Sequence, residues 1–107
     1  MIACAGCGAA KPPTYQLTQS EAAIRGAEEI GASNVPKAAL HLKMARDYVE
    51  AAQKLISDQQ GYDEARALLK RAEADAELAI ALSREAQARE ETEEAVRRVL
   101  KLRKELD

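Results

Sequence analysis

The sequence predicts an all-α protein: a short helix, then an antiparallel helical hairpin with a long, coiled-coil-like C-terminal helix. Two observations support this fold class. Hydrophobic residues make up 47% of the 107 residues, but only 3% are aromatic and 32% are charged. This composition is typical of long helices and coiled coils rather than of a thick globular core. In addition, apolar residues recur every three or four positions over three segments that glycine or proline separates.

The first helix is expected over residues 18–31. Thr18 and Glu21 have the spacing of a capping box, in which each side chain binds the backbone amide of the other residue. The expected apolar face comprises Ala22, Ala23, Ile24, Ala27 and Ile30. Gly31 suits the left-handed conformation that commonly follows a helix. Residues 8–17 contain two consecutive prolines, so we expect an extended linker there.

The second helix is expected over residues 35–58, because Pro36 favours the first helical position and an apolar stripe follows it. That stripe comprises Ala38, Leu42, Ala45, Val49, Ala52 and Ile56, and it is widened by Leu40, Met44, Tyr48 and Leu55. A third helix is expected over residues 62–106, with Asp63 as its N-cap. Its first stripe comprises Ala65, Leu69, Ala72, Ala76, Ala79 and Ser83.

The second and third helices differ in length. At 1.5 Å per residue, the third would be roughly 65 Å long and the second about 33 Å. Helices joined by a short loop pack antiparallel, so the second can cover only the first half of the third. The uncovered half has its own stripe at heptad spacing, and its phase is displaced between Ser83 and Ala88, as by a local insertion.

We therefore expect another protein chain, identical or different, to bind along residues 88–106. The residues of this expected interaction stripe are Ala88, Thr92, Ala95, Val99, Leu102 and Leu106.

Charge and residue types exclude several other functions. The net charge of −2 provides no basic excess for binding nucleic acid. No apolar run approaches the ~18–20 residues of a membrane-spanning helix. His41 is the single histidine and is expected at a solvent-facing or interface position. Residues 90–94 lack the alternating ligands and turn glycine of a calcium loop. We expect no enzymatic activity, no cofactor and no metal.

The N-terminal residues resemble a processing motif. Ala5-Gly6-Cys7 resembles the end of a lipobox, after which Cys7 would be lipidated and residues 1–7 would be a signal remnant. A complete signal has an apolar region of 7–15 residues, so this hypothesis requires one upstream of Met1. Two alternatives remain. Cys4 and Cys7 are an incidental pair, or they form a CxxC metal or redox site, although neither a second pair nor a βαβ pattern accompanies them.

Several motifs occur in a recognisable order: Ala5-Gly6-Cys7, Pro12-Pro13-Thr14, Ser20-Glu21-Ala22-Ala23-Ile24, Val35-Pro36-Lys37-Ala38-Ala39-Leu40 and Gly61-Tyr62-Asp63-Glu64-Ala65-Arg66. On these motifs, the chain from Pro12 to about Glu90 resembles a bacterial domain family of unknown function that occurs in outer-membrane lipoproteins, sometimes ahead of an OmpA-like domain. The resemblance implies a non-enzymatic structural or interaction module on the periplasmic face of the outer membrane, anchored through Cys7. Gly8, by resemblance to lipoprotein sorting signals, implies the outer rather than the inner membrane.

A soluble helical adaptor that oligomerises through its C-terminal helix is the alternative function. Residues 61–65 also resemble a fragment of a tetratricopeptide repeat. A repeat array needs about three stacked copies, and the sequence shows one helix pair. The similarity therefore extends only to the packing of a helix-turn-helix unit.

Overall fold

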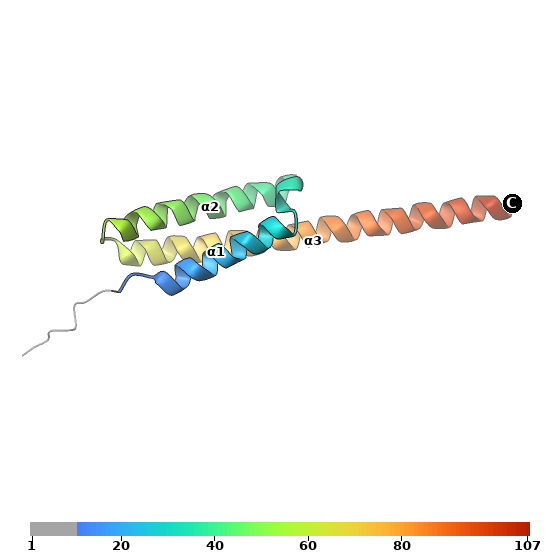
Figure 1. The fold of residues 1–107 in the computed structure, drawn as a ribbon. Helices are drawn as coiled ribbons and strands as arrows, with labels where there is room; N and C mark the ends of the chain where they lie inside the picture. The colour runs from blue at the N-terminus through green and yellow to red at the C-terminus, as the bar shows by residue number, and fades with distance from the viewer. Residues whose placement is uncertain (1–10) are drawn as a thin grey trace, which may run out of the picture.

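The computed structural model describes residues 11–107, which form three α-helices and one short 3-10 turn (Figure 1). The elements are α1 (Thr14–Glu29), η2 (Ala32–Asn34), α2 (Pro36–Ser57) and α3 (Tyr62–Leu106). α1 and α2 lie beside the first half of α3, and α2 runs antiparallel to it; the second half of α3 extends beyond both (Figure 1). These residues contain no strand, which confirms the all-α fold class.

The structure confirms the predicted hairpin. α2 begins at Pro36 and α3 begins at Tyr62, as expected. The buried residues of α3 are the six of its predicted first stripe: Ala65, Leu69, Ala72, Ala76, Ala79 and Ser83. In α2, five of the six stripe residues are buried, Ile56 is half-buried, and Leu40 is 57% exposed. Leu40 therefore does not widen the packed face, whereas Tyr48 and Leu55 pack against the core and do so. Met44 is half-buried but does not belong to the residues packed against the core.

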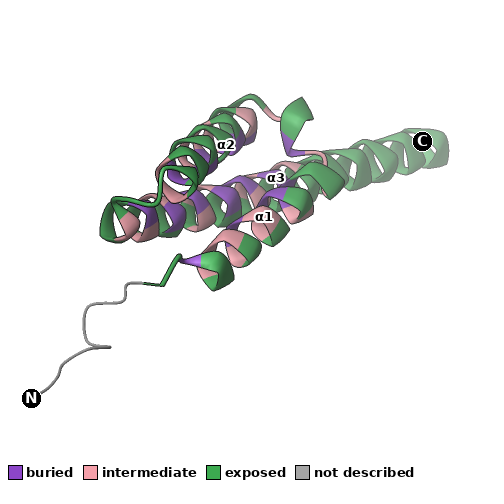
Figure 2. Ribbon diagram, turned by 60° about the vertical axis from the view of Figure 1, so that its left-hand side comes forward, coloured by how far each residue is buried: buried purple, intermediate pink, exposed green. Residues whose placement is uncertain are grey.

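The core is a thin seam of small side chains. Most of the buried hydrophobic residues are alanines, and Leu42 and Leu69 are the largest fully buried side chains in the described part of the chain. Figure 2 shows the buried positions of the three helices facing one another. Small residues allow the helix axes to approach closely. The helices are therefore held together by close packing of small side chains rather than by burial of large ones.

The first helix begins four residues earlier than predicted. Thr18 lies inside α1 and its hydroxyl donates to the carbonyl of Thr14 at 3.0 Å, so the predicted capping box is wrong. Pro13 is buried at the N-cap position, and its carbonyl accepts the amide of Leu17 at 3.0 Å. Proline lacks an amide hydrogen and is well tolerated where a helix starts. The linker predicted over residues 8–17 is therefore wrong for residues 14–17, and residues 8–10 lie outside the described part.

Two glycines with positive φ angles lie in the connections between the helices. Gly31 follows α1 with φ +86°, which confirms its predicted left-handed conformation. Gly61 has φ +65° and occupies the N-cap position of α3, so the prediction of Asp63 as N-cap is wrong. Asp63 lies instead in the first turn of α3, where its carboxylate binds Arg66 at 3.2 Å and favourably opposes the helix dipole.

Candidate interaction surface on the C-terminal half of α3

α3 leaves the three-helix body near Ser83, which is its last buried residue. Ala86 is half-buried, and every residue from Gln87 to Asp107 is exposed (Figure 2). The Gln87 side chain donates to the carbonyl of Ile30 at 3.1 Å and ties α3 to the end of α1. The prediction that α2 covers only the first half of α3 is confirmed.

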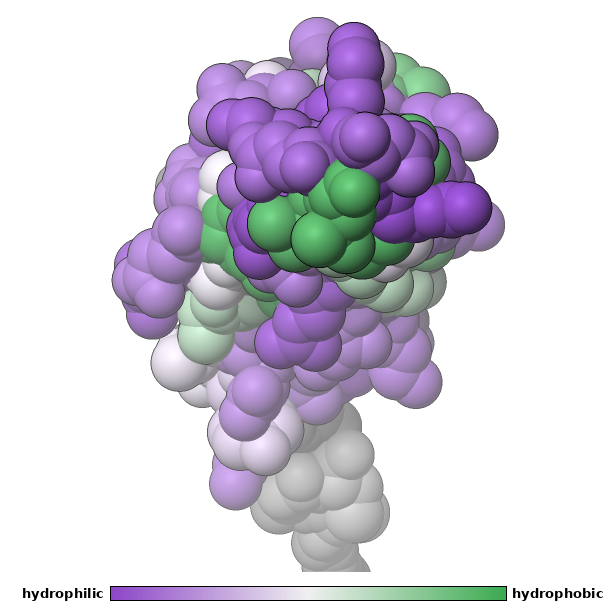
Figure 3. Space-filling model, turned by 90° about the vertical axis from the view of Figure 1, so that its right-hand side faces the viewer, coloured by the Kyte–Doolittle hydropathy of each residue, from purple (hydrophilic) through white to green (hydrophobic). Residues whose placement is uncertain are grey.

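All six residues of the predicted interaction stripe are exposed, including Leu102 at 58% and Leu106 at 87%. Figure 3, which looks at the C-terminal end of the molecule, shows a hydrophobic patch among hydrophilic side chains. Val96 and Leu100 are also more than half exposed and widen the stripe. These two residues were not predicted from the sequence, although Val96 lies four residues after Thr92 of the stripe and Leu100 lies four residues after Val96.

The stripe lies on a different side of α3 from the core. Five positions separate Ser83 from Ala88, which at 100° per residue is a rotation of roughly 140°. The exposed residues Ala74, Leu78 and Ala81 continue the stripe backwards at the same heptad spacing. The insertion inferred from the sequence is therefore wrong, because α3 carries two uninterrupted seams on different sides.

We call the exposed one the outer seam: Ala74, Leu78, Ala81, Glu85, Ala88, Thr92, Ala95, Val99, Leu102 and Leu106.

The outer seam contains a shallow apolar groove of about 320 Å³. It is lined by Thr92, Ala95, Val96, Val99 and Leu100. The hydroxyl of Thr92 donates to the carbonyl of Ala88 at 2.9 Å, so this polar group is satisfied within the helix. The groove therefore offers methyl and methylene groups, which suit apolar side chains of a partner.

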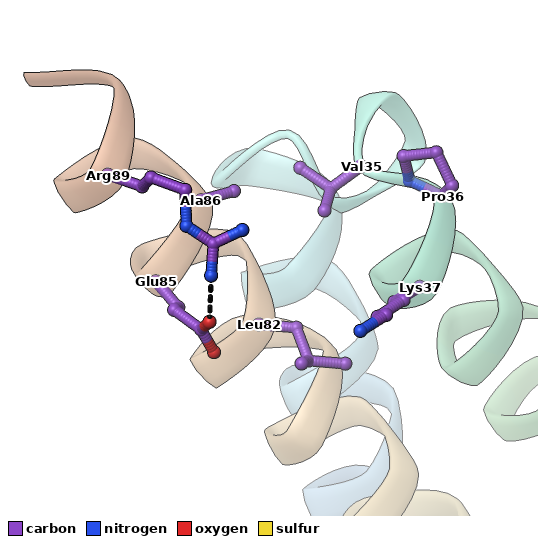
Figure 4. Close-up of a pocket in the computed structure, with 7 residues that line it drawn as sticks. All are labelled: Val35, Pro36, Lys37, Leu82, Glu85, Ala86 and Arg89. Atoms are coloured by element: carbon purple, nitrogen blue, oxygen red, sulfur yellow. Dashed lines mark hydrogen bonds and ion pairs between the residues drawn. The ribbon is translucent and has the colours of Figure 1, made fainter. Parts of the chain in front are cut away.

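A cleft of about 290 Å³ lies where α3 leaves the bundle (Figure 4). Val35, Pro36 and Lys37 line it from the start of α2; Leu82, Glu85, Ala86 and Arg89 line it from α3. Arg89 binds Glu85 at 2.6 Å. Glu85 also belongs to the outer seam, so the cleft and the seam are neighbouring parts of one surface.

His41 lies at the interface of α2 and α3, one of the two positions expected from the sequence. Its Nδ1 is 2.8 Å from Oδ1 of Asp75, and both side chains are largely buried, with exposures of 27% and 17%. Sequence reasoning did not identify Asp75. The sequence contained only a weak signal for Asp75: it is an acidic residue between buried alanines of the first stripe of α3.

The remaining candidate features concern metal binding, the acidic residues 90–94, the two cysteines and membrane insertion. Within residues 11–107, no three histidine, cysteine, aspartate or glutamate side chains are grouped so as to hold a metal ion. Residues 90–94 are all exposed. Cys4 and Cys7 lie outside the described residues. None of the described helices is both long and apolar enough to cross a membrane.

The sequence matches DUF4398, a domain of unknown function, over residues 15–95. The chain belongs to the DUF4398 family. No curated protein and no solved structure matches it. The DUF4398 match covers the three-helix body and the first part of the outer seam. Val96, Val99, Leu102 and Leu106 lie beyond it, so the most apolar part of the stripe lies outside the matched region.

Proposed function

We propose that this DUF4398 protein is a non-enzymatic, lipid-anchored protein-interaction module of the cell envelope. The outer seam is the observation that carries the proposal. It presents Val99, Leu102 and Leu106 on a helix that the rest of the described chain leaves bare. Contiguous exposed apolar surface of this kind marks protein-binding sites.

The arrangement of the helices fits attachment through the N-terminal segment. The start of α1 and the end of α3 lie at opposite ends of the helical body (Figure 1). α3 has 45 residues and is therefore about 67 Å long. Lipid on Cys7 would thus hold the chain at one end and leave the outer seam free for a partner. Multiple acyl chains, at about 0.8 kcal/mol per buried CH₂ group, would make the attachment firm.

The linings of the groove and of the cleft support a role without catalysis. The groove is apolar, and the carboxylate in the cleft is paired with Arg89. A catalytic site needs convergent groups that are free to act as nucleophile, acid or base. These two hollows offer shape and apolar contact instead, which are the properties of a docking surface.

Mass spectrometry of the protein produced in its own host from its natural gene tests the anchor. We expect a mature chain that begins at an acylated Cys7 and fractionates with the outer membrane. Cys7→Ser should abolish both acylation and membrane association. Cys4→Ser is the matched control and should change neither. Recovery of Cys7 as an unmodified thiol would reject the lipoprotein part of the proposal.

Site-specific photo-crosslinking in cells tests the interaction part. A photoreactive residue replacing Val99 in the outer seam should give a covalent protein adduct. The same residue replacing Arg97, on the opposite side of α3, should give little or none. Equal adduct yields from the two positions would show that the outer seam does not select a partner.

The alternative function is a soluble helical adaptor, which uses the same outer seam without an anchor. An unmodified Cys7 together with a specific adduct from position 99 would favour this alternative. The two tests therefore separate the anchor from the interaction surface.

A further inference from the structure

We propose that the outer seam binds a second copy of this chain in an antiparallel coiled coil, with Val99 facing Ala88 of the second copy. This inference rests on the interaction role proposed above, but not on the lipid at Cys7. The sizes of the side chains along the outer seam, the charges beside it and the position of the cleft all favour this register.

The sizes of the side chains along the outer seam are complementary in this register. In the heptad of the outer seam, Val99 and Leu106 occupy a positions, and Ala81 and Ala88 occupy d positions. Antiparallel helices pair each a position with a d position of the partner. Val99 then faces Ala88, and Leu106 faces Ala81 of the second copy. Val99 and Leu106 thereby meet alanines, the alternation of large and small residues that packs a core without voids, whereas Leu102 faces Glu85. A parallel pair would instead place Leu102 against Leu102 and leave Ala88 against Ala88.

Charges along one flank of the outer seam alternate in sign every seven residues. These g positions are Glu77, Arg84, Glu91, Arg98 and Glu105, and all are exposed. In an antiparallel pair this flank faces the same flank of the partner, so such charges determine orientation. The proposed register brings Arg98 beside Glu91 and Arg84 beside Glu105 of the second copy. Each attraction occurs twice because the pair is symmetric.

Other registers bring like charges together. A shift of one heptad in one direction places Arg98 beside Arg98, and in the other direction Glu91 beside Glu91. In a parallel pair the g flank faces the e flank, so Arg98 would lie beside Arg103 and Arg84 beside Arg89. Like charges at these positions are unfavourable. The alternation therefore selects one antiparallel register.

The flank of the outer seam opposite the g positions explains why Val96 and Leu100 are apolar. The e positions of the heptad are Asp75, Leu82, Arg89, Val96 and Arg103. In an antiparallel pair the e flanks face each other, and the cleft lies on this flank beside Leu82 and Arg89. At the proposed register, Val96 of the second copy lies beside the aliphatic stem of Arg89. Leu100 of the second copy reaches the level of the cleft. The two residues that widen the stripe thus receive a covering surface.

The three-helix body leaves room for the second helix. α1 contacts α3 where Ser20 meets Leu69, and α2 contacts it where His41 meets Asp75. The Ser20 contact lies on the side of α3 opposite the outer seam. Asp75 lies on the e flank of the seam, but in the proposed register the second copy ends at the level of about residue 80 and does not reach it. The single charged residue of the seam, Glu85, is already paired with Arg89.

Sedimentation equilibrium of the full chain tests the charge pairing. We expect a monomer–dimer equilibrium. Arg98→Glu turns two attractive pairs into repulsive ones and should raise the dissociation constant about tenfold. Adding Glu91→Arg reverses both partners and should restore most of the affinity. Arg97→Glu is the matched control on the opposite side of α3 and should have little effect. Stronger association of Arg98→Glu would indicate a parallel pair and overturn the proposal.

Disulfide trapping tests the register. In chains carrying Cys4→Ser and Cys7→Ser, we introduce Ala88→Cys in one preparation and Val99→Cys in another. Oxidation of the mixture should give a covalent dimer, whereas either preparation alone should not. A dimer from Val99→Cys alone would establish the parallel arrangement and overturn the proposal.

A chain that stays strictly monomeric at high micromolar concentration would also overturn the proposed antiparallel dimer. If the photoreactive residue at position 99 then captures a different protein in cells, the proposed interaction function stands without this dimer. Acylation of Cys7 is measured separately, so the failure of one proposal is distinguishable from the failure of the other.

Discussion

Ser20 is the polar residue at the centre of the contact between α1 and α3. It is fully buried, and its hydroxyl oxygen lies 2.9 Å from the carbonyl of Leu69 and 2.8 Å from that of Gln16. Ser20→Ala removes the donor to α3, so we expect the free energy of unfolding to fall by about 1 kcal/mol. Urea denaturation followed by circular dichroism measures this change. The exposed Ser33→Ala is the control, and an equal response of both variants would contradict the assignment.

Gly26 and Gly31 should respond to alanine in opposite directions. A Cβ atom on Gly26, inside α1, would lie 3.4 Å from the side chain of Ile80, which is an ordinary contact. Gly26→Ala should therefore raise the free energy of unfolding by about 0.5–1 kcal/mol. Gly31 has φ +86°, where a Cβ atom is strained, so Gly31→Ala should lower the free energy by about 1 kcal/mol. Thermal denaturation compares them; changes of equal sign would contradict this.

The C-terminal part of α3 is an element that the rest of its own chain does not stabilise. Residues from Gln87 onward are exposed, and Gln87 makes the last contact with α1. A chain that ends at Glu90 should keep the unfolding transition of the three-helix body within about 0.5 kcal/mol. The measurement is made at low concentration, where the full chain is monomeric. A loss of several kcal/mol would show that residues 91–107 support the bundle.

The hairpin could be predicted because the residue pattern that specifies each of its helices lies within that helix. Each of α2 and α3 has one face of small or apolar residues at helical spacing, and those faces are the ones that become buried. The start of α1 could not be predicted this way. Thr18 and Glu21 fit a capping box, but the packing of Pro13 into the described body sets the start of the helix at Thr14.

The candidate site was predictable in position but not in orientation. Unequal helix lengths sufficed to show that residues 88–106 lack cover. Spacing alone did not show that the outer seam and the core seam lie on different sides of α3, because an insertion explains the same phase difference. The pair of His41 and Asp75 joins residues 34 positions apart, so only the packing of α2 on α3 reveals it.

For the molecule as a whole, the antiparallel pair would place its two attachment points far apart. The centre of the pair lies between Glu93 and Glu94, and each three-helix body lies at one end. From Tyr62 of one copy to Tyr62 of the other, the rod would measure about 95 Å. Two lipids on Cys7 would therefore hold the rod at both ends. The outer seam would be covered along the middle of the rod.

The antiparallel pair differs in length from a monomer and from a parallel pair, and this difference can be measured. The helical body of a monomer or a parallel pair has the length of one α3, about 67 Å, whereas the antiparallel pair lengthens that body by at least about 25 Å. Small-angle X-ray scattering over a concentration series should show the maximum dimension rising as dimer forms. Arg98→Glu at the same concentrations should keep the shorter dimension. If the scattering mass doubles while the maximum dimension stays constant, the copies lie parallel, and the charge alternation along the outer seam does not set their orientation.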